Sequence, residues 1–126
     1  MLNQNQIDSI DEIIKARLIE AGLDHIILLD MAGNTIVKHD NGKSLLDTTA
    51  FAALAVGNFA AVNAMAKLVG ESEFSLLFHK GEKLSIHFNK VNDETLLITI
   101  FNKDISLGLV RLKVNETIQE INKILN

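Results

Sequence analysis

The chain has 126 residues, which suits one domain with its own core, because a domain of this length buries roughly two thirds of the surface of its unfolded chain. Hydrophobic residues make up 48% of the chain and charged residues 22%, as in ordinary soluble domains. The net charge of -4 and the pI near 5.5 give no basic footprint for nucleic acid or anionic membranes. We therefore expect a single domain over residues 1–126 and a protein partner.

The chain contains no cysteine, which excludes disulfides and thiolate metal sites and is compatible with a reducing compartment. Its first residues, MLNQNQIDSIDE, carry acidic side chains where a signal peptide needs a positive region, so we expect a cytoplasmic protein. The most apolar stretch, residues 50–69, is interrupted by Asn58, Asn63 and Lys67. It falls short of the roughly 18 uninterrupted apolar residues of a membrane span, so no membrane insertion is expected.

The first predicted element is a helix that begins near Ile7 and ends at Gly22, a residue type favoured just beyond helix ends. A β-hairpin follows, formed by HIILLDM and TIVKH around the turn residues 32–34. Its first strand is apolar on both faces, which predicts helices on both sides. The helix is indicated by a stripe of apolar residues at helical spacing: Ile7, Ile10, Ile13, Ile14, Leu18 and Ala21.

A second helix is predicted over residues 49–69, ended by Gly70, and a last helix over residues 107–125. Between them lie three predicted strands, residues 74–79, 84–91 and 95–101. The order is therefore α-β-β-α-β-β-β-α. The first and fifth strands are apolar on both faces and should lie side by side in the middle, with the third strand at an edge.

The turn after residue 79 can be tested for register. A two-residue loop on Gly81 and Glu82 would put apolar residues beside Ser85 and His87. We predict a three-residue loop, which aligns Phe74, Leu76 and Phe78 with Phe88, Ile86 and Leu84.

The second predicted helix has two contrasting sides when its residues are spaced at about 100° each. One side is bulky and suits a sheet: Phe51, Leu54, Phe59, Val62, Met65 and Val69. The opposite side is small, which permits close approach by another helix and favours a homodimer over the alternative of a helix buried inside a monomer. The predicted interface consists of Ala53, Gly57, Ala60 and Ala64, flanked by Val56, Asn63 and Lys67.

Catalytic and metal sites are not indicated. His79 and His87 would share the less apolar face of neighbouring strands, but no third ligand has suitable spacing, so both are interpreted as solvent-exposed. Asp24 and Asp30 lie about 20 Å apart along a strand, too far for paired acid and base catalysis. Nucleophile-elbow and phosphate-loop motifs are missing. We expect no catalytic residue, cofactor or metal.

The order and spacing of four phrases resemble the Roadblock/dynein light-chain family over nearly the whole chain. The phrases are GLDHIILLDMAGNTIV, FAALAVGNFAAVNAMAKLVG, the paired strands after it, and SLGLVR. The resemblance implies an α+β sandwich whose five-stranded antiparallel sheet carries one helix on one face and two on the other. It also implies dimerisation through the second helix and third strand.

For function, the resemblance implies a scaffold or regulator of a Ras-like small GTPase, similar to bacterial GTPase-activating partners in gliding motility. Two alternatives stay open. One is an adaptor that binds a GTPase without changing nucleotide turnover. The other is a profilin-like small-ligand sensor, which would need an apolar cavity with a few convergent polar groups.

Overall fold

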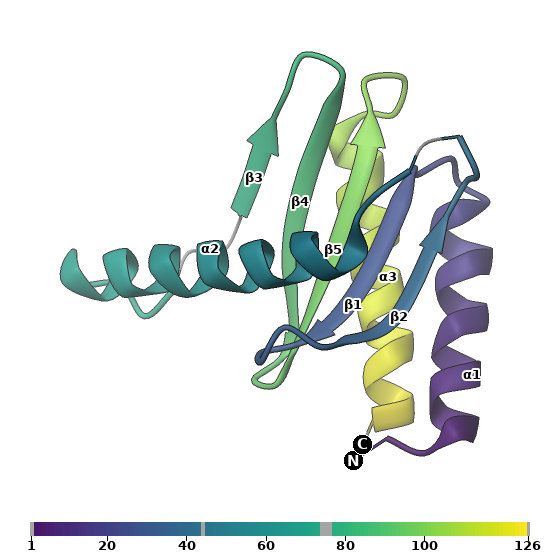
Figure 1. The fold of residues 1–126 in the computed structure, drawn as a ribbon, viewed down its shortest axis with the longest axis horizontal. Helices are drawn as coiled ribbons and strands as arrows, with labels where there is room; N and C mark the ends of the chain where they lie inside the picture. Colours follow the sequence, from purple (N-terminus) through teal and green to yellow (C-terminus); the bar gives the residue numbers. More distant parts are fainter. Residues whose placement is uncertain (1, 44, 74–76, 126) are drawn as a thin grey trace.

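Figure 1 shows the computed structural model, which describes residues 2–43, 45–73 and 77–125. In these residues the elements follow the predicted order α-β-β-α-β-β-β-α, and five antiparallel strands form one sheet in the order β2-β1-β5-β4-β3. The strands are β1 (His25–Asp30), β2 (Thr35–Asp40), β3 (Leu77–Lys80), β4 (Leu84–Asn92) and β5 (Thr95–Asn102).

The sheet lies between two layers of helices. Helices α1 (Gln4–Ile14) and α3 (Leu107–Leu125) cover one face, and α2 (Thr48–Leu68) crosses the other (Figure 1). One hydrophobic core lies on each face, and the neighbouring strands β1 and β5 contribute to both. The α+β class, the adjacent β1 and β5, and the edge position of β3 are as predicted.

Helix α1 starts earlier than its apolar stripe, because Asn3 and Gln6 form a reciprocal cap in which each side chain accepts a hydrogen bond from the other's backbone N–H at 2.9 Å. The helix continues into a π-helical turn, η1 (Lys15–Ile19). The predicted stop at Gly22 is confirmed: this residue has a positive φ of 104°, which glycine adopts without strain. The buried stripe is Ile10, Ile14 and Leu18.

The predicted register between β3 and β4 is wrong. Phe78 pairs with His87 rather than with Leu84, because the chain turns at residues 82–83 and the Gly81 N–H donates to the Leu84 carbonyl at 2.9 Å. A Cβ on Gly81 would lie 2.5 Å from that carbonyl oxygen, so the tight turn requires glycine. The predicted partners Phe74 and Leu76 lie outside the described residues.

The corrected register moves Phe78 to the face that α1 and α3 cover, because an odd shift in pairing exchanges the two faces of a strand. There its ring stacks on Phe101 at a centroid distance of 6.2 Å. His87 lies on the same face and is 1% exposed, whereas His79 lies on the α2 face and is exposed. The prediction that both histidines are exposed on one face is therefore wrong for His87.

Candidate interaction surface on helix α2

Helix α2 begins and ends with defined caps. The Asp47 side chain accepts a hydrogen bond from the Ala50 N–H at 3.1 Å, which satisfies one of the free donors of the first turn. At the other end, Gly70 has a positive φ of 91° and follows the last turn, as predicted. These caps fix the length of a helix that has one charged residue, Lys67.

The side of α2 that packs on the sheet consists of small and aromatic residues. Ala52 and Ala55 are buried, which lets the helix backbone approach the sheet closely. Phe51, Val56 and Phe59 pack beside them on the core of that face. That core is formed by Ile27, Leu29, Ala52, Ala55, Phe88, Leu96 and Ile98.

The predicted bulky side is therefore only partly correct. Phe51 and Phe59 contact the core as expected, but Leu54 is 75% exposed, Met65 54% and Val69 72%. For Met65 and Val69 the physical reason is that the second half of α2 projects past the edge of the sheet, where bulky side chains have no sheet to cover (Figure 1). Leu54 lies in the first half, beside the buried Ala52 and Ala55, and is exposed because its side chain points away from the sheet.

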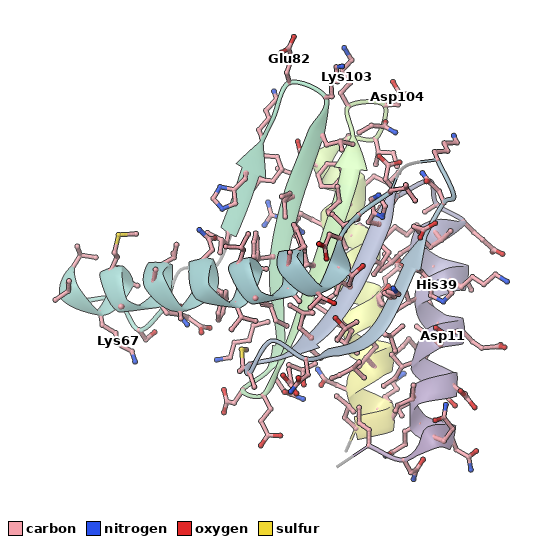
Figure 2. The ribbon with its side chains drawn as sticks, in the orientation of Figure 1. Asp11, His39, Lys67, Glu82, Lys103 and Asp104 are labelled. Atoms are coloured by element: carbon pink, nitrogen blue, oxygen red, sulfur yellow. The ribbon has the colours of Figure 1, made fainter. Side chains whose placement is uncertain are left out.

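The predicted small side lies opposite the sheet. Ala53, Gly57, Ala60 and Ala64 are exposed, and a Cβ added to Gly57 would meet no atom within 4 Å. Of the flanking residues, Lys67 is exposed and extends from the projecting half of the helix (Figure 2), while Val56 and Asn63 are half-buried, Val56 against the core on this face. We call the exposed α2 face the surface formed by Ala53, Leu54, Gly57, Ala60, Ala64, Met65 and Leu68.

The exposed α2 face is unusual for a surface helix, which normally carries charged residues toward water. Hydration of such apolar area is unfavourable by roughly 25 cal/mol per Å², so a partner that covers it gains free energy. The helix is held in place beside β3, because the Asn58 Oδ1 lies 3.2 Å from the His79 Nε2. A partner would therefore meet a preformed surface.

By length and composition alone, α2 could also cross a membrane, and 17% of its most apolar 18-residue window is buried. The same composition is expected of a helix that packs against another copy of itself. The residues Asn58, Asn63 and Lys67 interrupt the apolar stretch, as noted from the sequence.

Other candidate sites are weaker. Within the described residues, no group of three or more histidine, aspartate or glutamate side chains could hold a metal ion. Asp24 and Asp30 lie at opposite ends of β1. Asp30 accepts hydrogen bonds from the Ala32 and Asn34 N–H groups at 3.0 and 2.9 Å, and its bonds to Asn34 hold the pKa of its carboxyl below the usual value. It stabilises the β1–β2 turn.

A cavity of about 500 Å³ lies between the start of α1, the end of α3 and one end of the sheet. Its walls mix apolar side chains such as Ile36 with Asp30 and Glu94. The Asp30 carboxylate is occupied by hydrogen bonds within its own turn rather than turned to a ligand.

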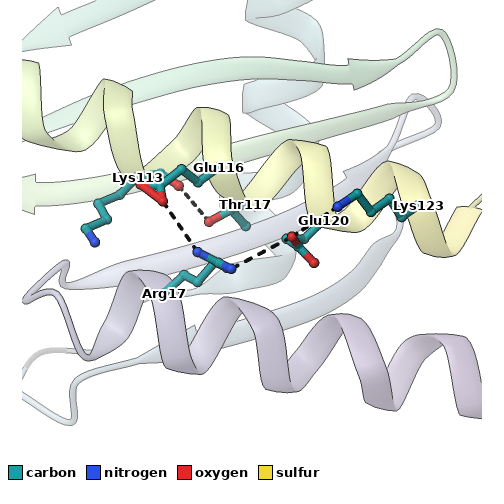
Figure 3. A network of polar contacts seen from close by, with 6 residues as sticks. All are labelled: Arg17, Lys113, Glu116, Thr117, Glu120 and Lys123. Carbon is teal, nitrogen blue, oxygen red and sulfur yellow. Dashed lines mark hydrogen bonds and ion pairs between the residues drawn. The ribbon is translucent and has the colours of Figure 1, made fainter.

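Arg17 joins the two helices of the opposite layer (Figure 3). Its guanidinium lies 3.5 Å from the Glu116 carboxylate and 3.8 Å from that of Glu120, both on α3. This places Arg17 on the far side of the sheet from α2. The arginine is a structural link between η1 and α3.

A model of the Roadblock/LC7 domain matches residues 9–101, about three quarters of the chain. The protein belongs to the Roadblock/LC7 family. The match covers β1, β2, α2, β3, β4 and nearly all of β5. The resemblance noted in the sequence is thereby confirmed, and a search of curated proteins finds no match.

Solved structures with the same fold include MglB of Myxococcus xanthus, which is 33% identical over 99% of this chain and 93% of that chain, with a TM-score of 0.89. The gliding protein MglB of Thermus thermophilus is 25% identical over 98% of this chain and 93% of that one, with a TM-score of 0.88. A structure described as MglB with tetrameric arrangement has the same identity and coverage and a TM-score of 0.90. In each case the similarity covers nearly the full length of both chains.

Sequence reasoning missed the exposed bulky residues Met65 and Leu68 in the second half of α2. The available signal was length: at about 1.5 Å per residue, a 21-residue helix spans about 32 Å, and five strands about 4.8 Å apart span only about 19 Å between their outer strands. A helix that crosses such a sheet must extend beyond it.

Proposed function

We propose that this Roadblock/LC7 protein is a non-catalytic, homodimeric interaction module that binds and regulates a Ras-like small GTPase. The observation that carries the proposal is the exposed α2 face, which is apolar and preformed. Such a surface fits a protein partner and offers none of the groups that catalysis requires.

The first partner is a second copy of the chain. A twofold dimer uses the same surface on both subunits, so the surface must complement itself. Gly57, Ala60 and Ala64 leave room for two helices to approach, and Leu54 and Leu68 can pack at the border of the contact. The tetrameric arrangement of a similar MglB supports self-association as a property of this type of domain.

The second partner is the GTPase. The support is family membership and the 33% identity to MglB, together with the resemblance to bacterial GTPase-activating partners. We propose that the module acts by holding the GTPase's own switch segments in an active arrangement, since a partner shifts such an equilibrium by its difference in affinity for the two states. An adaptor would bind the GTPase and leave its rate of hydrolysis unchanged. Both roles fit a cytoplasmic protein that does not insert into a membrane.

A profilin-like sensor is less well supported. The cavity at the start of α1 is open and mixed in character, and Asp30 on its wall is committed to the β1–β2 turn. No observation on that cavity favours a particular ligand.

The proposal is tested with the Ras-like GTPases of the source organism, each loaded with GDP or a non-hydrolysable GTP analogue. We expect one of them to bind in the GTP form and its single-turnover hydrolysis to accelerate. Binding without acceleration, in either nucleotide state, would favour the adaptor. Failure of every GTPase to bind a correctly folded dimer would contradict the proposal.

A further inference from the structure

The segment between β2 and α2 contains the one Asn-Gly pair of the chain, Asn41 and Gly42. In such a pair the backbone nitrogen of the glycine can attack the asparagine side chain, because glycine has no Cβ to hinder the ring that forms. Gly42 has a positive φ of 78°, and a Cβ built on it would meet no heavy atom within 4 Å. No described side chain or neighbouring segment therefore crowds this peptide bond.

Three hydrogen bonds position the groups around this peptide bond. The Gly42 N–H donates to the Asp40 Oδ1 at 2.7 Å, so a carboxylate is ready to accept its proton. The Asn41 Oδ1 accepts a hydrogen bond from the Lys43 N–H at 3.0 Å, which polarises the amide carbonyl that is attacked. The Asn41 Nδ2 donates to the Asp24 Oδ1 at 2.7 Å, which holds the side chain in the loop.

We propose that Asn41 is a self-modification site that loses its amide by intramolecular attack. The Gly42 nitrogen gives its proton to Asp40 and bonds to the Asn41 Cγ; the bond from Cγ to Nδ2 breaks, and ammonia leaves with the proton. Water then opens the five-membered imide at one of its two carbonyls. The product is aspartate or isoaspartate, and the sum is asparagine plus water giving a carboxylic acid plus ammonia.

The change places two carboxylates in contact. Asp24 is 7% exposed and its Oδ1 accepts from both Asn41 and Asn102, at 2.7 and 3.3 Å. Its backbone carbonyl also accepts from the Asn41 N–H at 3.0 Å. Replacing the Asn41 amide with a carboxylate removes the Nδ2–H that donates to Asp24. It also adds a second negative charge beside the buried Asp24 carboxylate, which is unfavourable.

The consequence reaches α2. Asp24 links the start of β1 to the segment that leads to the α2 cap at Asp47. Loss of the side-chain bond between Asp24 and Asn41 leaves residues 41–43 held to Asp24 by one backbone hydrogen bond, and this weaker attachment loosens the chain that leads to α2. The modification therefore lowers the local stability of the start of α2 slowly and irreversibly. This inference does not depend on the proposed GTPase partner.

Asn102 is a matched internal control. Its Nδ2 also donates to the Asp24 Oδ1, at 3.3 Å, and its Oδ1 accepts from the N–H two residues further on, that of Asp104, at 2.8 Å, as the Asn41 Oδ1 does from Lys43. Its successor, however, is Lys103, whose side chain hinders ring formation. Lys103 and Asp104 lie in an exposed loop (Figure 2), so exposure does not separate the two sites.

The first test incubates the purified full chain at pH 8 and 37 °C and follows each asparagine by peptide mapping, with an isoaspartate-specific methyltransferase as a second readout. We expect Asn41 to convert while Asn102 keeps its amide, and Asp40→Ala to slow the conversion by about tenfold, a fraction of what positioned bases contribute in enzymes. An Asn41 amide that lasts as long as that of Asn102 would overturn the site, and an unchanged rate in Asp40→Ala would overturn the role of Asp40.

The second test measures the consequence. Asn41→Asp mimics one product and should lower Tm by roughly 5 °C and speed amide hydrogen exchange at the start of α2. The double variant Asp24→Asn with Asn41→Asp restores one amide and one carboxylate, so it should recover most of the lost Tm. A double variant no more stable than Asn41→Asp alone would refute the proposed repulsion.

Discussion

At the scale of single residues, the buried imidazole of His87 is the most consequential side chain outside α2. It is 1% exposed, its ring lies edge-on to Phe78 at a centroid distance of 6.5 Å, and its β5 neighbour is the buried Thr99. Burial, with a smaller contribution from the positive charge of Arg111, lowers the pKa of His87 from 6.5 to about 4.

The pH dependence of stability follows from this pKa. Above pH 6.5 His87 is neutral in both states, so its contribution to stability is fully present. Between pH 6.5 and about 4 the unfolded chain binds a proton that the folded chain does not, so stability falls as the pH falls. From pH 7.5 to 5 the loss is about 2 kcal/mol, at about 1.36 kcal/mol per pH unit below 6.5.

Urea unfolding at both pH values, with wild type and His87→Gln, measures this loss. We expect the variant to be less stable at pH 7.5 but to lose about 2 kcal/mol less than wild type on acidification. An identical pH dependence in both proteins would show that His87 is not the titrating group.

Arg17 supports a second prediction at this scale, which concerns catalysis by the partner. An arginine finger would have to project into the GTPase, but Arg17 is held by Glu116 and Glu120, and Arg111 lies near the start of α3 on the face opposite α2. We expect Arg17→Ala and Arg111→Ala, each shown to bind normally, to retain stimulation of single-turnover hydrolysis. A loss of a hundredfold or more in either, about 2.7 kcal/mol of barrier, would mean that a finger exists.

At the scale of elements, helix α2 shows which side-chain exposures helical periodicity predicts and which it does not. The small exposed side, Ala53, Gly57, Ala60 and Ala64, lies where helical spacing put it. The exposure of Met65 and Val69 was not predicted, because periodicity gives the direction of a side chain and not the point where the sheet beneath it ends. The exposure of Leu54 was missed for another reason: the predicted bulky side was not centred on the residues that are buried, Ala52 and Ala55.

The turn between β3 and β4 shows a different limit. Alternation of Phe74, Leu76 and Phe78 favoured an apolar match across the hairpin, but the backbone hydrogen bond at Gly81 decided the pairing. A shift of pairing by an odd number of residues was enough to bury His87. Turn geometry, which depends on a few backbone angles, is weakly encoded in a single sequence.

Gly57 gives a prediction for α2 as an element. It lies in the helix interior and is exposed, so Gly57→Ala should raise the stability of the isolated subunit by about 0.5–1 kcal/mol through helix propensity. If two α2 helices approach closely there, the added methyl group also weakens the dimer. Unfolding at low and high protein concentration separates the effects, and a variant stabilised equally at both would place Gly57 outside the contact.

At the scale of the whole molecule, the layered α+β architecture was predictable because each element carries its own signal. Strands β1 and β5 are apolar on both faces of the sheet. The amphipathic helices α1 and α3 cover one of these two faces. The other face is covered by a helix that keeps a second apolar surface exposed, and this surface is the basis of the proposed function. No pattern within one chain specifies which partner covers it.

The central claim is that the exposed α2 face joins two copies of the chain, and light scattering of Ala60→Glu tests it most directly. The charge would lie in the middle of the proposed contact, where it would be desolvated without a partner. The matched control, Ala16→Glu, adds the same charge to an exposed alanine in η1 on the other side of the sheet. We expect wild type and Ala16→Glu to be dimers at micromolar concentration and Ala60→Glu to be a folded monomer. A dimeric Ala60→Glu, or a monomeric wild type, would contradict the account.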